Sequence, residues 1–391
     1  MPNISPQLCT LSCERVIEHL LKLIHAQGFK PIVHFELEGV YEAEAGFNQL
    51  DYLGVNRALS KLNIDGELKT EFWRNQWEYV SLFNGQSPLK EAENLARAMW
   101  VLPSIMQQHG AKKVEFKPVA WAADKGRYVP GSKAIFSTDT RLVHIPNAIQ
   151  MNISVENVQG ENLVPVSNIG EWLQYQLLQT SYDCCLLFLP EEDAFKRLTL
   201  RKDYALDAEL SSPFTLSGGH QGSIALYKQW GKHNQAMGLE PQFYGLNNTV
   251  LSYSGDWKKT ARVEHRLGAT SRAYDPYLNI LFILLNTLDA LQHWQACEGM
   301  PPSYASRDLP SSMYDDETMG NKQLGAITVF EKSDWFANSI DRYCADLDRD
   351  LAGSLGEGLK AKFLQQFKPK CVTYNASTFL REIRTMTPKS G

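Results

Sequence analysis

The stretch RVEHRLGATSRAYDPYL, from Arg262 to Leu278, constrains the fold more than any other part of the sequence. Arg262, Glu264 and Arg266 occupy every second position, so on a β-strand their side chains would share one face. The segment that follows, YLNILFILLNTL, is among the most apolar in the chain and must be buried. A row of charges directly before a core helix is either a solvated surface strand or the lining of a charged site.

The composition is that of a globular protein with ample apolar material for a core. The chain has 391 residues, of which 43% are apolar and 21% charged, and its length alone favours two or three domains. A net charge of −5 argues against broad electrostatic binding to nucleic acid. The seven cysteines are scattered and form no CxxC pair, which indicates a reducing compartment. Because neither a secretory signal nor a membrane span is visible, we expect a cytoplasmic protein without a membrane partner.

Periodicity predicts an alternation of strands and helices. Alternating apolar and polar residues predict strands at 31–41, 75–83, 113–121 and 148–155. Helical patterns cover 13–27 with Ser12 as cap, 88–109 with Ser87 as cap, 169–187, 335–351 and 359–367. Residues 299–326 are expected to form a long surface loop. No glycine-rich phosphate loop follows a predicted strand, and no GxSxG elbow is present. The pattern predicts an α+β chain with an antiparallel sheet and helices packed behind it.

Acidic residues on strands are the strongest chemical signal. Four lie on predicted strands or at their edges, Glu264 is a fifth, and for any one of them a solvated face is the simpler interpretation. If they converge, their repulsion needs cations, and Mg²⁺ prefers carboxylate oxygens. Arginines close by would suit phosphate oxygens. The four acids are Glu36, Glu38, Glu71 and Glu78.

Six segments carry a resemblance through their order and spacing. PIVHFELEGVY (31–41) is similar to a G-x-E-x-E-F-x-L strand, EFWRNQWEYV (71–80) to E-x4-Q-x-E, and HGAKKVEFKPV (109–119) to H-G-x4-F-x2-K-P. LPEEDAFKRL (189–198) is similar to P-T-x-N-S-Y-K-R-L, WGKHNQA (230–236) to W-G-x-x-N-R-x, and the stretch from Arg262 to R-x-E-x-R-L followed by N-P-Y-L. In this order they resemble the catalytic domain of the glutamine synthetase family, over roughly residues 12–291.

The resemblance implies a fold class and a domain plan. It implies an α+β glutamine synthetase/guanidino-kinase-like catalytic domain, with a curved antiparallel sheet that carries metal carboxylates and is backed by helices. We expect an extension at 1–11, the catalytic domain at 12–385 without the family's N-terminal β-grasp domain, and a disordered tail at 386–391. Because that small domain takes part in the family's ring assembly, we expect a monomer or dimer.

The resemblance also implies a divalent-metal site. Two or three Mg²⁺ or Mn²⁺ ions would bind the acids, with one ion held by Glu38, Glu71 and Glu78. A second ion would be held by Glu36 and Glu264. The family's G-S-G-x-H-x-H-x-S is changed here to NAIQMNIS, where Gln150 and Asn152 replace the histidines and Ser154 is kept. Gln150 could still offer an oxygen to a metal.

ATP and the substrates would meet the basic residues. Arg262 and Arg266 would lie against the ATP phosphates and the transferring phosphoryl group, with Asn152 and Ser154 nearby. Arg197 would bind the carboxylate substrate, and Asp203 would lie beside the attacking amine. Gln235 stands where the family has an arginine, which weakens the expected phosphate clamp.

These implied roles favour an ATP- and Mg²⁺-dependent ligase that joins a carboxylate to an amine through an acyl phosphate. The changed motif and the expected lack of the small domain suggest a substrate pair larger than glutamate and ammonia, and a macromolecule is one candidate for it. Two alternatives remain open at this stage. One is another ATP-using transferase, such as a kinase or nucleotidyl transferase, and the other is a non-catalytic nucleotide-binding relative.

Overall fold

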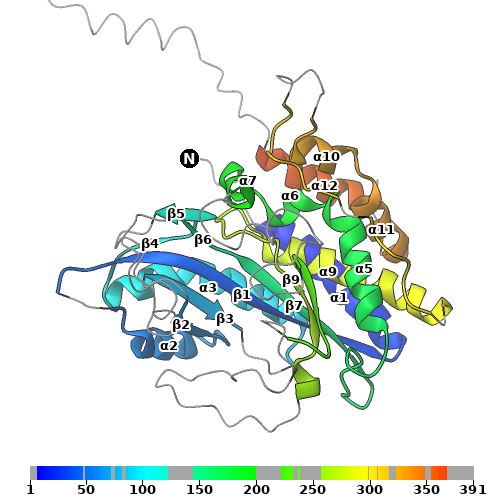
Figure 1. Cartoon of the computed structure of the whole chain (residues 1–391), viewed down its shortest axis with the longest axis horizontal. Helices are drawn as coiled ribbons and strands as arrows, with labels where there is room; N and C mark the ends of the chain where they lie inside the picture. The colour runs from blue at the N-terminus through cyan, green and yellow to red at the C-terminus, as the bar shows by residue number, and fades with distance from the viewer. Residues whose placement is uncertain are drawn as a thin grey trace, which may run out of the picture.

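The computed structural model is organised around one antiparallel sheet. It describes residues 7–46, 49–71, 75–81, 85–121, 144–199, 222–231, 237, 257–297, 299–305, 307–316, 323–347 and 354–367. Within these residues the sheet has seven strands, and the long strand β1 lies in its interior, between β3 and β7 (Figure 1). The order is β2 (Glu67–Thr70), β3 (Gln76–Val80), β1 (Phe29–Ala43), β7 (Ile149–Asn157), β9 (Arg262–His265) and β8 (Ile224–Tyr227), and β4 (Ala111–Glu115) also pairs with β1.

Helices form a layer against the sheet and a second group beyond it. The layer contains α1 (Gln7–Ala26), α3 (Pro88–Gln108), α5 (Ile169–Ser181) and α9 (Pro276–Ala296). The second group contains α10 (Ala326–Lys332), α11 (Trp335–Tyr343) and α12 (Leu355–Leu364), at the upper right of Figure 1. Smaller elements are α2 (Tyr52–Lys61), α6 (Cys185–Phe188), α7 (Glu192–Thr199), the 3₁₀ turns Trp257–Thr260 and Gln365–Phe367, and a pair of short strands, β5 (Val119–Trp121) and β6 (His144–Pro146).

Side-chain alternation in β1 explains how the sheet packs. Val33, Phe35 and Leu37 are fully buried in the hydrophobic core that the helices complete. The residues between them point to the opposite face. Gly39 is required in this strand because a Cβ there would come within 2.3 Å of the Trp77 ring on β3. One face of the sheet is therefore apolar, and the other is free to carry polar groups.

The predicted strands at 31–41 and 148–155 are confirmed, as is the one at 75–83 within the described residues, while the segment 113–121 and several helix ends differ. Residues 113–121 form two strands, β4 and β5, because Pro118 lies between them and cannot donate a ladder hydrogen bond. Helix α1 begins at Gln7, so Ser12 is inside the helix and the predicted cap is wrong. Ser87 does cap α3, accepting a hydrogen bond from the Lys90 backbone N–H. A cap contributes only about 1 kcal/mol, so neighbouring turns can override it.

Three predicted helices also have bounds that differ from the prediction. The expected helix at 169–187 is interrupted after Ser181 and resumes as α6, and the expected helix at 335–351 ends at Tyr343. Helix α12 begins four residues earlier than the predicted 359, where the Ser354 hydroxyl accepts from the Glu357 N–H. No described helix is both long and apolar enough to cross a lipid bilayer.

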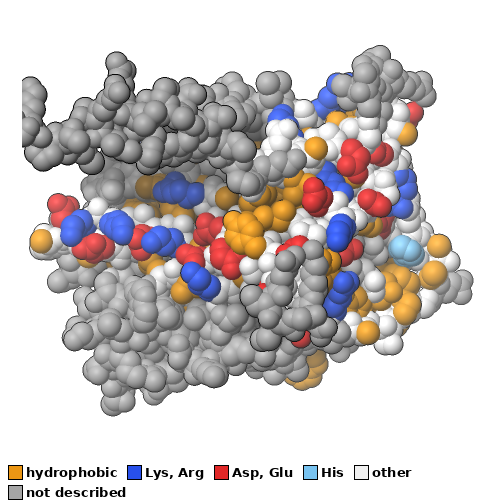
Figure 2. All heavy atoms as spheres, turned by 90° about the horizontal axis from the view of Figure 1, so that it is seen from above, with side chains coloured by type: hydrophobic (Ala, Val, Ile, Leu, Met, Phe, Trp, Pro, Cys, Tyr) orange, Lys and Arg blue, Asp and Glu red, His pale blue; other side chains and the backbone are white. Residues whose placement is uncertain are grey.

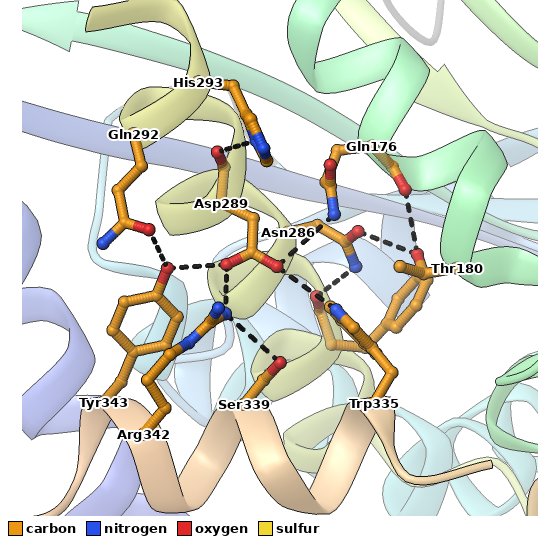
Figure 3. Close-up of polar contacts among 11 residues, drawn as sticks. Gln176, Thr180, Asn286, Asp289, Gln292, His293, Trp335, Ser339, Arg342 and Tyr343 are labelled. Carbon is orange, nitrogen blue, oxygen red and sulfur yellow. Dashed lines mark hydrogen bonds and ion pairs between the residues drawn. The ribbon is translucent and has the colours of Figure 1, made fainter. Parts of the chain in front are cut away.

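Asp289 on the core helix α9 ties three helices together (Figure 3). Its carboxylate accepts hydrogen bonds from Gln176 of α5 at 3.3 Å and from the Trp335 indole of α11 at 3.2 Å. Arg342 and the Tyr343 hydroxyl, at the end of α11, donate to the other oxygen at 2.5 and 2.6 Å. Asp289 is only 4% exposed. The network fixes α11 on α9, because a buried carboxylate needs each of these donors.

His265 is a buried neutral histidine on the apolar face of β9. Its Nε2 lies 3.2 Å from the Ser181 hydroxyl, and its ring meets Phe188 and Phe282 edge to face. Burial lowers the pKa of His265 from its ordinary 6.5 to about 3. Between these values the unfolded chain binds a proton that the folded chain does not. Stability therefore falls as the pH falls below 6.5.

We expect His265 alone to lower the free energy of unfolding by about 2 kcal/mol when the pH falls from 7 to 5. Replacing His265 with Gln should remove that part of the acid sensitivity, whatever its effect at pH 7. The measurement is urea unfolding of both proteins at the two pH values, with exposed His25→Gln as the control. An unchanged difference between pH 7 and pH 5 in His265→Gln would contradict the account.

Candidate functional site

The sheet register brings the predicted acids and amides onto one face. Glu38 of β1 lies directly opposite Glu78 of β3, and Glu36 lies opposite Gln150 of β7. Further along β7, Asn152 is opposite Glu264 of β9. Residues directly opposite in antiparallel strands point to the same side, with Cβ atoms about 5 Å apart. Segments more than a hundred residues apart in the chain therefore meet at one polar face.

This polar face is buried rather than solvated. Glu36, Glu78 and Gln150 are each less than a tenth exposed, and Glu264 is fully buried. Burying carboxylates without partners is costly, so each needs a donor or a cation. A simple surface strand would not bear that cost, which favours a built site over a solvated face.

The alternating charges on β9 form an ion-pair row. The Glu264 carboxylate lies 2.7 Å from Arg262 Nη2 and 3.1 Å from Arg266 Nε. Arg262 also donates to Asn152 Oδ1 at 2.6 Å and stacks over the Tyr227 ring at 4.7 Å. The row predicted to share a face does so, and its central acid binds the arginines on both sides. Asn152 extends the row by donating to Glu36 at 2.9 Å.

Glu38 sits at the centre of the polar face. Its carboxylate accepts from the Ala148 backbone N–H at 2.8 Å and, at 3.4 Å each, from the amides of Gln76 and Gln150. Burial and the nearby Glu78 raise the pKa of Glu38 to about 7, although the Ala148 N–H opposes the shift. Because both burial and the neighbouring Glu78 disfavour the ionised carboxylate, a cation bound beside Glu38 would stabilise it.

Two buried arginines approach Glu36 and Glu38. Arg197, on α7, is 4% exposed and donates to the backbone carbonyls of Leu267 and Arg266 at 3.1 and 3.3 Å. Burial lowers the pKa of Arg197 to about 10 and, together with the charge of Arg197, that of Arg266 to about 9. Attraction to Glu36 and Glu38 opposes the shift at Arg266, so both guanidiniums stay charged at neutral pH. Among the residues that the structure describes, none accepts a hydrogen bond from the Arg197 Nε–H.

A lysine that sequence reasoning missed also faces this cluster. Lys69 lies opposite Glu78 on the neighbouring strand β2, and its ammonium is 2.9 Å from the Glu78 carboxylate. Burial lowers the pKa of Lys69, but Glu78, Glu36 and Glu71 outweigh burial and raise it above its usual range. The alternation Glu67, Lys69, Glu71 in the sequence was the available signal, since it places Lys69 on the face of the acids.

The remaining predicted residues lie at the margins of the site or outside the described chain. Glu71 follows the end of β2, where its backbone N–H donates to the Gln76 carbonyl at 3.2 Å. Ser154 is opposite Ile32, roughly 13 Å along β7 from Gln150 at the rise of an extended strand. Asp203 and Gln235 fall outside the described residues.

Gln76 is a second residue whose role at the site was not predicted. Its amide donates to Glu38 and also, at 3.1 Å, to the side chain of Asn147. Gln76 lies two residues before Glu78 and therefore on the same face of β3, but its contact to Glu38 depends on the pairing of β1 with β3. No local pattern in the sequence carries that information.

The donors present suit one hard divalent ion on the β1–β7 side. Gln150 Oε1 is buried and accepts no hydrogen bond from any described residue, and it neighbours the carboxylates of Glu36 and Glu38. Carboxylate and amide oxygens are what Mg²⁺ and Mn²⁺ prefer. Within the described ranges, no three His, Cys, Asp or Glu side chains lie close enough to hold a metal on their own. The fit is therefore to a mixed set of two carboxylates and one amide.

Outside this face, charges of both signs are interspersed on the surface. One example is the exposed pair of Lys112 on β4 and Glu42 on β1, which are 2.7 Å apart. Figure 2 shows Lys or Arg beside Asp or Glu across the face seen there, between the residues drawn in grey. Such exposed pairs contribute little stability, about 1 kcal/mol at most. They contrast with the buried pairs of the polar face.

Comparison with solved structures identifies this architecture. A protein described as a novel glutamine synthase homolog superposes with a TM-score of 0.55 over 92% of this chain and 72% of its own, at 14% identity. GmaS in complex with ADP gives a TM-score of 0.56 over 94% and 77%, also at 14% identity. The chain has the glutamine synthetase fold. The glutamine synthetase of Plasmodium falciparum matches too, with a TM-score of 0.54 over 96% and 77% at 11% identity.

The glutamine synthetase fold was thus predicted correctly from short motifs, although comparison of the whole sequence does not detect it. No model of a known protein family and no curated protein matches the chain by sequence. At 11–14% identity the likeness is one of fold. In this chain, the polar face of the glutamine synthetase fold carries the cluster of acids, arginines and amides described above.

Proposed function

We propose that this chain is an ATP-dependent ligase that joins a carboxylate to an amine through an acyl phosphate. Its glutamine synthetase fold and the buried polar face support the proposal, as does the ADP bound to the structurally similar GmaS. The changed residues Gln150 and Asn152, where the family motif has histidines, favour a substrate pair other than glutamate and ammonia. The carboxylate substrate would resemble glutamate in presenting an anionic group to an arginine.

The chain's own residues divide this work between them. Glu36, Glu38 and Gln150 would hold a Mg²⁺ or Mn²⁺ ion, which when bound supplies charge neutralisation for phosphoryl transfer. Arg262 and Arg266 would orient the phosphate oxygens, after exchanging part of their contact with Glu264 for the nucleotide. Fixed guanidiniums in a water-poor site stabilise the charge that develops during transfer.

Arg197 would bind the carboxylate that receives the phosphoryl group. Its guanidinium is held by the carbonyls of Leu267 and Arg266, so its position is set before any substrate arrives. Pre-positioning of this kind reduces the entropic cost of aligning two substrates. The proposed role of Asp203 as the acid beside the amine stays a proposal from the resemblance.

One observation carries the proposal more than any other. Glu36, Gln150 and Arg266 are each less than a tenth exposed and Glu264 is fully buried, and they share the face of the sheet opposite the helices with the partly buried Glu38. Buried charges at this density cost stability and serve no packing purpose, because the core is on the other face. Sites with such concentrated titratable groups are more often functional than structural.

The test is release of ADP and phosphate from ATP with Mg²⁺, in panels of carboxylates paired with amines. We expect release that depends on both substrates, and a loss of about a hundredfold or more in Glu38→Gln. The control is Glu42→Gln, four residues along β1 in an exposed pair with Lys112, which should stay within about twofold of the wild type. Release of AMP or pyrophosphate would instead support a nucleotidyl transferase.

A non-catalytic nucleotide-binding relative is the second candidate. The observation favouring it is that Glu264 and Glu78 are already paired with arginine and lysine, so part of the cluster is neutral without metal. Calorimetric titration with ATP and Mg²⁺ separates the candidates when combined with the release assay. Binding without release in any panel would favour the non-catalytic protein and count against the ligase.

A further inference from the structure

Lys69 occupies a position on the polar face where neighbouring carboxylates favour a positive charge. It lies on β2, directly opposite Glu78, which in turn lies directly opposite Glu38 on β1. Lysine, glutamate and glutamate therefore form one row across three adjacent strands. Their side chains share a face, and the ammonium of Lys69 contacts the Glu78 carboxylate at 2.9 Å.

The surroundings of Lys69 are acidic on more than one side. Glu36 and Glu71, besides Glu78, attract its charge. Glu78 is nearly buried, with a side chain 8% exposed, whereas the Lys69 side chain is 36% exposed and reaches in from the edge of the sheet. A single positive charge thus contacts the Glu78 carboxylate and is attracted by two further carboxylates.

We propose that the Lys69 ammonium takes the place of one divalent cation, so that this chain binds metal only on the Glu36–Glu38–Gln150 side of the cluster. A divalent ion beside Glu78 would have to displace the ammonium from its carboxylate partner or lie next to it. Because the ammonium and a metal ion beside Glu78 would repel each other, Lys69 lowers the affinity of that position for a divalent ion. Lys69 in this way determines how many ions the site takes up.

The inference rests on the proposed use of divalent cations, but it does not depend on the ligase reaction. Its test is to count Mn²⁺ by calorimetric titration, supported by electron paramagnetic resonance, without any nucleotide. We expect Lys69→Met to bind one more Mn²⁺ per chain than the wild type, or to bind at the existing count about tenfold more tightly. Lys69→Gln should behave like Lys69→Met, because it keeps an N–H donor for Glu78 and removes only the charge.

Thermal unfolding provides a second readout that a purely structural lysine would not produce. Without metal, both variants should unfold at lower temperature, since Glu78 loses its cation. Mn²⁺ should then raise the unfolding temperature of the variants by more than it raises that of the wild type. If either variant folds only with Mn²⁺ present, that dependence is itself the expected result.

Lys30→Met is the matched control. Lys30 and Glu156 also lie directly opposite each other on adjacent strands of the same sheet, 3.6 Å apart, but far along β1 from the cluster. This variant should leave the Mn²⁺ count, affinity and unfolding shift unchanged.

Equal Mn²⁺ counts and affinities in the wild type, Lys69→Met and Lys69→Gln, with equal Mn²⁺-induced unfolding shifts, would overturn the inference. That result together with ADP release would reject the role of Lys69 while leaving the ligase intact. A gained ion in the variants without any ADP release would support the role of Lys69 and count against the ligase.

Discussion

Replacing Glu264 with Gln is expected to destabilise the protein by about 3 kcal/mol or more. The fully buried carboxylate is shared by Arg262 and Arg266, whose side chains are 11% and 8% exposed. Glutamine has nearly the same shape but no charge, so both buried guanidiniums would lose the carboxylate that they contact directly and keep only the weaker attraction of Glu36 and, for Arg266, of Glu38. Arg262 would keep its contacts with Asn152 and Tyr227, which limits the loss.

The measurement is the free energy of unfolding in urea at neutral pH, in a chelating buffer. Glu42→Gln is again the control, because its pair with Lys112 lies at the surface and should be worth less than about 1 kcal/mol. A Glu264→Gln loss no larger than that of the control would mean that the arginines do not depend on Glu264. The arginine row would then need another explanation.

Removing the Asp289 carboxylate should also cost about 3–5 kcal/mol, at a position remote from the polar face. In Asp289→Ala buried Gln176 and partly buried Trp335 lose the acceptor of their N–H groups, and Arg342 and Tyr343 lose their link to α9 (Figure 3). Asp289→Asn should lose less, because the amide oxygen can still accept while half-exposed Arg342 turns to water.

Chemical unfolding measures the total loss, and amide hydrogen exchange in Trp335–Tyr343 measures whether α11 detaches first. Gln292→Ala is the control, since Gln292 is exposed and only accepts from the Tyr343 hydroxyl at 3.0 Å. Its effect should stay within about 0.5 kcal/mol. If exchange in α11 is unchanged in Asp289→Ala, the network does not hold that helix in place.

Most of the sheet could be predicted from the sequence because its information is local. In β1 the alternation of Val33, Phe35 and Leu37 with Glu36 and Glu38 requires only that successive strand residues point to opposite faces. The short row Arg262–Glu264–Arg266 follows the same rule. Helix ends were less predictable, as at Ser12, because a cap is a small contribution that the surrounding turns can outweigh.

The interior of the candidate site depended on contacts between distant segments. That Glu38 meets Glu78, and that Lys69 meets Glu78 in turn, follows from the register of three strands, and a shift of one residue would turn every side chain to the other face. Which carboxylate is held by an arginine, which by an amide and which by Lys69 is decided only when these strands pair. The ion pairs of Glu264 show the same dependence, because burial makes charged partners necessary.

The sequence by itself determined the antiparallel sheet, the apolar helix behind it and the presence of acids and arginines on strands. These follow from side-chain periodicity and hydrophobicity, which act over a few residues. Only the tertiary structure decided that the acids share one buried face and that Lys69 neutralises part of it. Such charge balance is a property of side chains that lie far apart in the chain and meet only after folding.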